Sequence, residues 1–242
     1  MKLKIKFLSL IFLFILIYSF LNSEQIDLSI KYLGIKVVKV RITDINNILE
    51  IRAKSTSIAS IASKMDNLYL SEYSDNYLPL RYEKKINQKK YVEDRITLYN
   101  RENLTANRTS YIDPDKNCEY SIKSTSRDFF SALFYLRNTI DLNQGYMWID
   151  ANKIIWKAEY RILGNEILKT PLGKISTIKV EITCFKISPG SKERSDMLTN
   201  NLVDEEKSLF FWFTDDEKRI PVKAKFAMKP FPVVWKLEAY QE

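Results

Sequence analysis

The stretch FFWFTDDEKRIPVK, from Phe210 to Lys223, contains the pattern that decides the fold. Leu209–Thr214 is rich in β-prone residues, and after Asp215–Arg219 apolar side chains return at every second position. Alternation with a period of two is typical of a half-buried strand, and a short polar run between two such strands is typical of a turn. We therefore predict a β-hairpin with Asp215–Arg219 as its loop. Because Pro221 has no N–H for a ladder, its strand is expected at a sheet edge or with that position turned outward.

The adjacent carboxylates of Asp215 and Asp216 admit three interpretations: an acid–base pair, ligands of a divalent cation, or a turn. Asp side chains accept hydrogen bonds from the backbone N–H groups that follow them, which makes Asp a preferred turn residue. Lys218 and Arg219 lie beside them and are expected to pair with them. The turn is the favoured interpretation, and a carboxylate-based hydrolase using Asp215 and Asp216 is the alternative.

Working outward from this hairpin, most of the chain repeats the same two-residue alternation. Leu49, Ile51 and Ala53 alternate with Ile48, Glu50 and Arg52, and further hairpins are predicted about Asn87-Gln88 and about Asp150–Asn152. Thr170–Gly173 reads as a turn before a long strand, whereas Ile58–Met65 fits either a short helix or a loop. A chain of 242 residues with this pattern suits one large all-β domain.

One segment, Ser124–Asn138, has helical rather than strand periodicity. Ser and Thr at its start and Asp128 favour a helix N-terminus, and its apolar side chains form one broad stripe. A stripe so rich in aromatic residues must be covered. The predicted fold class is therefore mainly β: a single curved antiparallel sheet or half-barrel packed on one amphipathic α-helix. The polar segment Ser188–Ser208 is predicted to be a long loop, either a surface excursion or a functional lid.

The composition excludes several classes of chemistry. The chain contains no His, which removes Ser-His-Asp catalysis and, with only two Cys, the usual zinc sites. Asp113–Asn117 resembles the first half of a calcium loop, but Cys118 stands where that loop needs Gly, so a turn is the better interpretation. No metal, cofactor or catalytic residue is predicted, and no stacking-aromatic signature indicates nucleic-acid binding.

The N-terminus predicts export. Residues 1–23 combine three lysines with an apolar run of the length found in a signal peptide, so the mature domain is expected to span 24–242 and to be periplasmic or otherwise exported. An anchor formed by an uncleaved N-terminal segment is the alternative, and it is the one predicted contact with the membrane. Cys118 and Cys184 either form a disulfide in an oxidising compartment or remain free thiols.

The aromatic side chains of the helix and of three strands are candidates for an apolar ligand site, although core packing also explains them. We predict that the ligand-binding residues of an apolar groove are Phe129, Phe130, Leu133, Phe134, Trp148, Trp156 and Trp212.

Several stretches together resemble one known family. The segments LGIKVVKV, NYLPLRYEKKI, DFFSALFYLRN, LGKISTIKVE and LFFWFTDDEKRIPVKAK occur in the same order as in the DUF3108 family of exported bacterial proteins of unknown function. The resemblance implies an envelope protein built on a curved sheet, similar to the half-barrels of lipoprotein carriers. It transfers no catalytic residue.

These observations lead to one expected function and two alternatives. The expected function is that of an envelope protein which binds a lipid or another apolar ligand between sheet and helix, with an envelope protein as a further candidate partner. The alternatives are the carboxylate-based hydrolase and a structural protein-interaction module that uses an open sheet edge.

Overall fold

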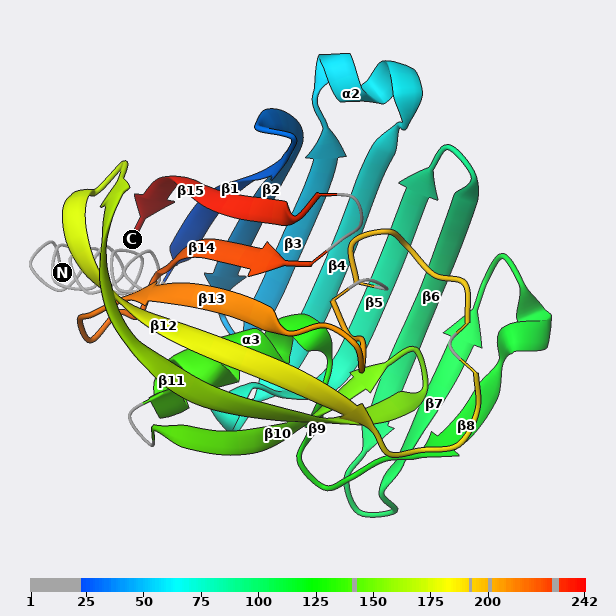
Figure 1. Cartoon of the computed structure of the whole chain (residues 1–242). Coiled ribbons are helices and arrows are strands. Elements are labelled where there is room, and N and C mark those ends of the chain that lie inside the picture. Colours follow the sequence, from blue (N-terminus) through cyan, green and yellow to red (C-terminus); the bar gives the residue numbers. More distant parts are fainter. Residues whose placement is uncertain (1–22, 141–142, 192, 200–201, 228–230) are drawn as a thin grey trace, which may run out of the picture.

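The computed structural model describes residues 23–140, 143–191, 193–199, 202–227 and 231–242 (Figure 1). Two α-helices are described, α2 (Ser57–Ala62) and α3 (Phe129–Thr139), with the 3₁₀ turns η1 (Asp75–Tyr77) and η2 (Pro114–Lys116). The described strands, in chain order, are β1 (Glu24–Tyr32), β2 (Ile35–Ile45), β3 (Ile48–Ser55), β4 (Met65–Ser74), β5 (Leu78–Gln88), β6 (Tyr91–Asn100), β7 (Thr105–Ser110), β8 (Cys118–Ser121), β9 (Ser126–Arg127), β10 (Gln144–Ala151), β11 (Ile154–Thr170), β12 (Gly173–Lys186), β13 (Leu209–Thr214), β14 (Pro221–Phe226) and β15 (Val233–Gln241).

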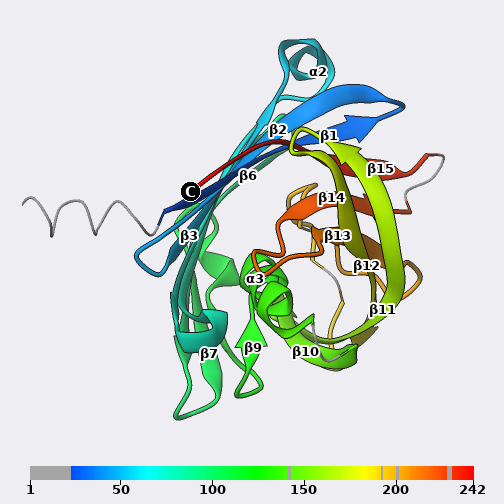
Figure 2. The same ribbon diagram turned by 90° about the vertical axis from the view of Figure 1, so that its left-hand side faces the viewer.

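All of these strands belong to one sheet, which confirms the prediction of a mainly β fold. Their order is β8-β7-β6-β5-β4-β3-β2-β1-β15-β14-β13-β12-β11-β10-β9. Neighbouring strands are antiparallel except for β9 and β10, which are parallel. The chain is thus a meander in two runs, joined where the first strand pairs with the last. Figure 2 shows the two runs as facing walls of one bent sheet, with α3 between them.

The alternating sequence decides which side chains face inward. In β3, Leu49, Ile51 and Ala53 are fully buried whereas Arg52 is exposed, as the sequence predicted. The turn after β2 places Asn46 and Asn47 at φ angles of 51° and 61°. Asn tolerates this left-handed region better than most residues, so a tight reversal is possible there.

Two predicted turns need correction in detail. The hairpin of β5 and β6 turns at Lys89-Lys90, not at Asn87-Gln88, because Gln88 continues the strand and pairs with Tyr91. Gln88 is buried, so ending the strand at Ile86 would remove this inward-facing side chain from the interior. The hairpin of β10 and β11 turns at Asn152-Lys153, later than the predicted Asp150–Asn152, because Asp150 and Ala151 continue the strand and pair with Ile155 and Ile154.

The predicted helix Ser124–Asn138 begins five residues late, at Phe129. Ser126 and Arg127 instead form β9, and Asp128 caps the helix by accepting hydrogen bonds from the N–H groups of Phe130 and Ser131, at 3.0 and 3.1 Å. An Asp at this position satisfies N–H groups that have no partner within the helix. A second, short helix is present in α2, which resolves the ambiguity of Ile58–Met65.

The hairpin of β13 and β14 confirms the first prediction from the sequence, but Pro221 contradicts the expectation attached to it. Strand β14 is central, between β13 and β15, and Pro221 is buried. Proline is tolerated there because it is the first residue of the strand, next to a register shift, and pairing with β15 starts only at Lys223.

Other predictions of the sequence have mixed outcomes. No disulfide joins Cys118 and Cys184 in the described structure, and Asp113 precedes a turn, η2, as expected. Within the described residues there is no cluster of potential metal ligands, and no helix is long and apolar enough to cross a membrane. The predicted signal segment lies outside the described residues except for Ser23.

Candidate functional site

An apolar pocket of about 400 Å³ lies where β1, β2 and β15 approach α2. Its floor consists of buried side chains, which are Ile30, Val38, Met65, Leu198, Phe226, Val233 and Trp235. Its mouth is lined by Tyr32, Val37, Ser55, Ala59, Ser63 and Met197. Larger hollows of about 580 and 740 Å³ are lined mostly by polar side chains, so the smaller pocket is the better candidate for an apolar ligand.

The floor of this pocket follows from strand register. Trp235 on β15 lies opposite Ile30 on β1, and Ile30 lies opposite Val38 on β2. Residues directly opposite in an antiparallel ladder point to the same face, so the three side chains form one row across three strands. The row exists because the first strand pairs with the last.

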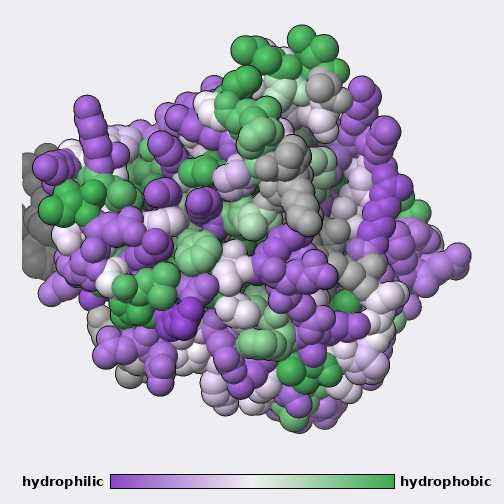
Figure 3. Space-filling view, in the orientation of Figure 1, coloured by the Kyte–Doolittle hydropathy of each residue, from purple (hydrophilic) through white to green (hydrophobic). Residues whose placement is uncertain are grey.

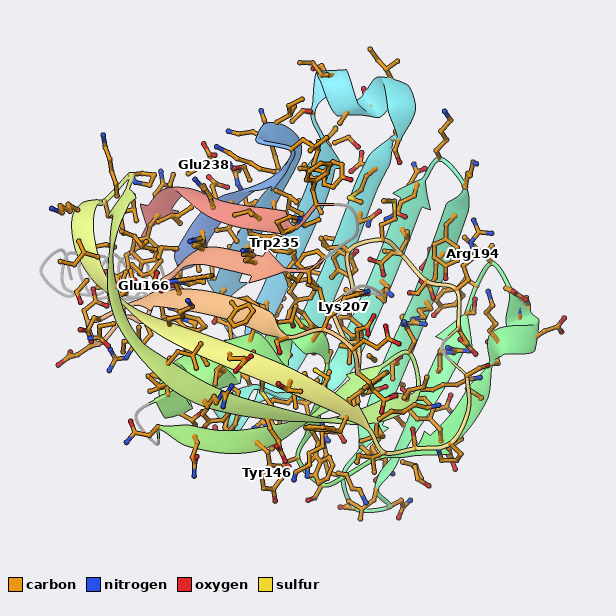
Figure 4. The ribbon with its side chains drawn as sticks, in the orientation of Figure 1. Tyr146, Glu166, Arg194, Lys207, Trp235 and Glu238 are labelled. Carbon is orange, nitrogen blue, oxygen red and sulfur yellow. The ribbon has the colours of Figure 1, made fainter. Side chains whose placement is uncertain are left out.

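Trp235 gives this apolar floor one polar group. The side chain is 5% exposed, and its indole Nε1–H has no hydrogen-bond acceptor within the described chain. A buried donor without a partner costs free energy, which an acceptor on a bound molecule would recover. Figure 4 shows Trp235 on β15 and Arg194 on the loop that follows β12.

The mouth of the pocket has an apolar rim. On α2, Ala59 lines the pocket while Ile58 and Ile61 are 74% and 84% exposed. Met197, across the mouth, is 51% exposed. Figure 3 shows the apolar side chains of α2 projecting at the top of the molecule. Apolar side chains gathered around an apolar opening are typical of a surface that contacts an apolar molecule.

One wall of the pocket comes from the polar segment Ser188–Ser208, and that wall is held by a buried ion pair. Asp196 is fully buried, and its carboxylate lies 2.7 Å from the ammonium of Lys84, which is 1% exposed. Asp196 also accepts hydrogen bonds from the N–H groups of Leu198 and Thr199. The ion pair therefore fixes Met197 and Leu198 against the pocket. The interpretation of this segment as a surface excursion is wrong, because its middle part enters the interior.

The surroundings of Asp196 set its protonation state. Burial alone would raise the pKa of the carboxyl, but the Lys84 ammonium and hydrogen bonds from Lys84 and Thr199 outweigh burial, so the pKa lies well below its usual range. Burial and the neighbouring Asp196 raise the pKa of Tyr69, whose hydroxyl donates to the carboxylate at 2.6 Å. Asp196 is thus charged at neutral pH, paired with Lys84.

Comparison with known proteins places this chain in a family. A family model described as "Protein of unknown function (DUF3108)" matches residues 25–230. The chain belongs to the DUF3108 family. A solved structure titled as a beta-barrel-like protein of the domain of unknown function DUF1849, from Brucella abortus, has a similar fold, with a TM-score of 0.55 at 9% identity over 90% of this chain and 96% of that one. No curated protein matches the sequence.

In this DUF3108 chain the aromatic residues predicted from the helix lie close together in the core. Phe129, Phe130, Leu133 and Phe134 are all buried, with Phe130 packed on Tyr69 at a ring distance of 5.2 Å. The described lining of the apolar pocket includes none of them. A ligand role for these side chains stays a prediction.

The three predicted tryptophans lie on three different strands, β10, β11 and β13. Trp148 is half-buried, with the Lys123 ammonium 5.6 Å from its ring, and Trp156 is buried in the core. Trp212 donates its Nε1–H to Glu166 at 2.9 Å, and the Lys223 ammonium lies 3.9 Å from its ring. The described lining of the apolar pocket includes none of the three.

Sequence reasoning missed the pocket because its residues come from eight separate places in the DUF3108 chain, which are β1, β2, β3, α2, the start of β4, the segment after β12, β14 and β15. Alternation marks Ile30 and Val38 as inward-facing, and the sequence contains Trp235 in a β-prone run. No local signal indicates that the three side chains share a pocket, since the pairing of β1 with β15 is what unites them.

Asp215 and Asp216 occupy the exposed tip of the β13–β14 hairpin. Asp216 accepts hydrogen bonds from the N–H groups of Lys218 and Arg219, both at 3.1 Å, as expected for a turn. Asp215 accepts from the side chains of Asn165 at 2.7 Å and Ser176 at 3.1 Å. Neither carboxylate lines a described hollow.

We expect Asp215→Ala and Asp216→Ala each to lower the free energy of unfolding by about 0.5–2 kcal/mol, the range of a lost capping-type hydrogen bond. Glu217→Ala, at the same exposed tip, is the control and should change it by less than about 0.5 kcal/mol. Urea denaturation measures the three values. A variant that keeps full stability and loses all function would instead favour the hydrolase.

Proposed function

We propose that this protein is an exported envelope protein that holds the acyl chain of a lipid, or a similarly apolar molecule, in the pocket between β1, β2, β15 and α2. The observation that carries the proposal is the pocket itself: a floor of buried apolar side chains with an opening at the surface. Its volume lies within the range of small-molecule sites, about 300–1,000 Å³.

Burial of a hydrocarbon chain supplies the free energy for binding. Each methylene that leaves water contributes about 0.8 kcal/mol, so roughly ten buried methylenes contribute about 8 kcal/mol before the costs of association. The one orphan donor in the floor, Trp235 Nε1–H, suits a ligand with an oxygen along its chain or at its end, such as an ester or a carboxyl group.

The N-terminal segment 1–23 supports the exported location, because its three lysines and apolar run are typical of a signal peptide. The bent sheet supports the comparison with the half-barrels of lipoprotein carriers at the level of fold. In this proposal the ligand lies between the sheet and the short helix α2, whereas the sequence pointed to the longer helix α3.

The test places a bulky side chain in the mouth. Ala59→Trp should reduce the affinity for a fluorescent fatty acid at least tenfold, because the indole would occupy the space of the chain. The matched control is Ser60→Trp on the same helix, where the side chain is exposed and does not line the pocket; it should bind as the wild type does.

Native mass spectrometry of the protein from membrane-containing extracts provides a second readout. The wild type and Ser60→Trp should carry a bound lipid mass that Ala59→Trp lacks. Equal binding by all three proteins, or a wild type that binds no amphiphile, would contradict the proposal.

A further inference from the structure

A second hollow, of about 440 Å³, adjoins the apolar pocket and differs from it in character. The residues that line it are Ser63, Gln88, Lys89, Lys90, Tyr91, Arg194, Ser195 and Met197. Ser63 and Met197 also line the mouth of the apolar pocket, so the two hollows adjoin at these two residues. A molecule whose chain fills the first can therefore place its end group in the second.

The second hollow carries positive charge. Lys89 and Lys90 form the turn of the β5–β6 hairpin, and Arg194 donates a hydrogen bond to the backbone carbonyl of Lys90 at 2.5 Å, which joins the loop to the hairpin. The Arg194 guanidinium lies 5.7 Å from the ring centre of Tyr91. The described residues that line the hollow include three cations and no Asp or Glu.

Gln88 provides an independent indication that a ligand binds here. Its side chain is 6% exposed and lines the hollow, and its Nε2 has no acceptor within the described chain. The other end of the amide is engaged, because Oε1 accepts a hydrogen bond from the N–H of Met197 at 3.3 Å. The unsatisfied group is thus a donor, and a buried donor beside cationic side chains is suited to an anionic oxygen.

We propose that this hollow binds the anionic headgroup, a phosphate or a carboxylate, of the amphiphile whose chain occupies the apolar pocket; the inference rests on the proposed function and names its ligand class. Lys90 and Arg194 supply charge, and Gln88 Nε2 supplies a directed hydrogen bond. Because Lys90 and Arg194 are exposed, their contribution is expected to weaken as salt is added.

The test compares single-chain phospholipids with identical acyl chains and different headgroups, below their micellar concentrations. At low salt the wild type should bind lysophosphatidic acid at least tenfold more tightly than the zwitterionic lysophosphatidylcholine. Lys90→Gln/Arg194→Gln should remove this preference by weakening binding of the anionic lipid alone. The single variant Arg194→Lys retains both the charge at this position and Lys90, so it should keep part of the preference for the anionic lipid.

The matched control removes two charges elsewhere. Lys169→Gln/Lys174→Gln changes an exposed pair at the tip of the β11–β12 hairpin, which Figure 1 shows on the side of the molecule opposite the β5–β6 turn, and should keep the full preference. If this control also lost the preference for the anionic lipid, the preference would come from the net charge of the protein and not from this hollow. That result would overturn the inference.

The remaining outcomes separate the two proposals. Equal wild-type affinity for both lipids would overturn the headgroup site while leaving the apolar pocket intact. No binding of either lipid, together with no effect of Ala59→Trp, would overturn the proposed function and the headgroup site with it. Binding of inorganic phosphate is measured as well, in the wild type and in Ala59→Trp. Tight binding of phosphate alone, with the same affinity in both proteins, would show that the hollow binds a free anion and would overturn the lipid assignment.

Discussion

Lys84→Met is expected to lower the free energy of unfolding by about 3–5 kcal/mol, because it leaves Asp196 buried without its counter-ion. Both side chains are almost fully buried, and Lys84 also donates to Ser195 Oγ at 3.0 Å. The control is Lys85→Met, one residue along the same strand. Lys85 is exposed and its ion pair with Glu83 is screened by solvent, so its loss should have a much smaller effect.

The pH dependence of this difference tests whether it originates in a buried carboxylate. Two carboxylates face the Lys84 ammonium, Asp196 at 2.7 Å and Glu93 at 3.6 Å, but in Lys84→Met Glu93 keeps its ion pair with Arg95, so Asp196 is the one left without a cation. In the wild type the pKa of Asp196 is lowered by folding, so its stabilisation is present above the unfolded value of about 3.9 and is lost as pH falls. In Lys84→Met, burial without the ammonium should raise that pKa, so acidification protonates the carboxyl and relieves the cost. The gap in stability between the two proteins should therefore narrow from pH 7 to pH 4.

A double variant completes the test. Lys84→Met/Asp196→Asn should recover part of the loss, because the unpaired charge of Asp196 is removed while the Asn oxygen can still accept from the N–H groups of Leu198 and Thr199. Lys84→Met should also weaken binding of the fluorescent fatty acid, since Met197 and Leu198 lose their anchor. A gap that is independent of pH would contradict the assignment to Asp196. Denaturant titrations at each pH provide the values.

Phe130→Ala is expected to lower the free energy of unfolding by about 3–5 kcal/mol, the range for truncation of a buried aromatic side chain. Phe130 is fully buried on α3, in ring contact with Tyr69 and with Phe129 at 5.2 and 5.6 Å. Its removal would leave a cavity between the helix and β4. Phe130→Leu refills much of that space and should cost clearly less.

This experiment also decides the role of the aromatic helix. If α3 is core, ligand affinity per folded molecule should be unchanged in Phe130→Ala, and only stability should fall. If instead the variant keeps its stability and loses fatty-acid binding, the ligand groove predicted from the sequence, lined by Phe129–Phe134, would be supported over the pocket beside α2.

The sequence by itself determined the mainly β class and the position of several strands, such as β3 and β13. Two-residue alternation fixed which side chains of β3 face inward, and Asp216, with two backbone donors within three residues, fixed the β13–β14 reversal. These features were predictable because the interactions that produce them are local. The predictions were wrong where pairing with a distant strand outweighed local preference. Ser126 and Arg127 pair with β10 and are not part of the helix. Pro221 lies in a central strand, next to a register shift.

Tertiary structure alone decided the candidate site. Lys84 and Ser195 are 111 positions apart, and nothing around either residue predicts that a lysine in a strand and a polar loop would meet in the interior. The same holds for Ile30 and Trp235, which share a pocket only because β1 pairs with β15. Alternation specifies that a side chain faces inward, but not which side chain it faces. That depends on the order of strands in the sheet and on its bend, which result from the packing of the whole chain.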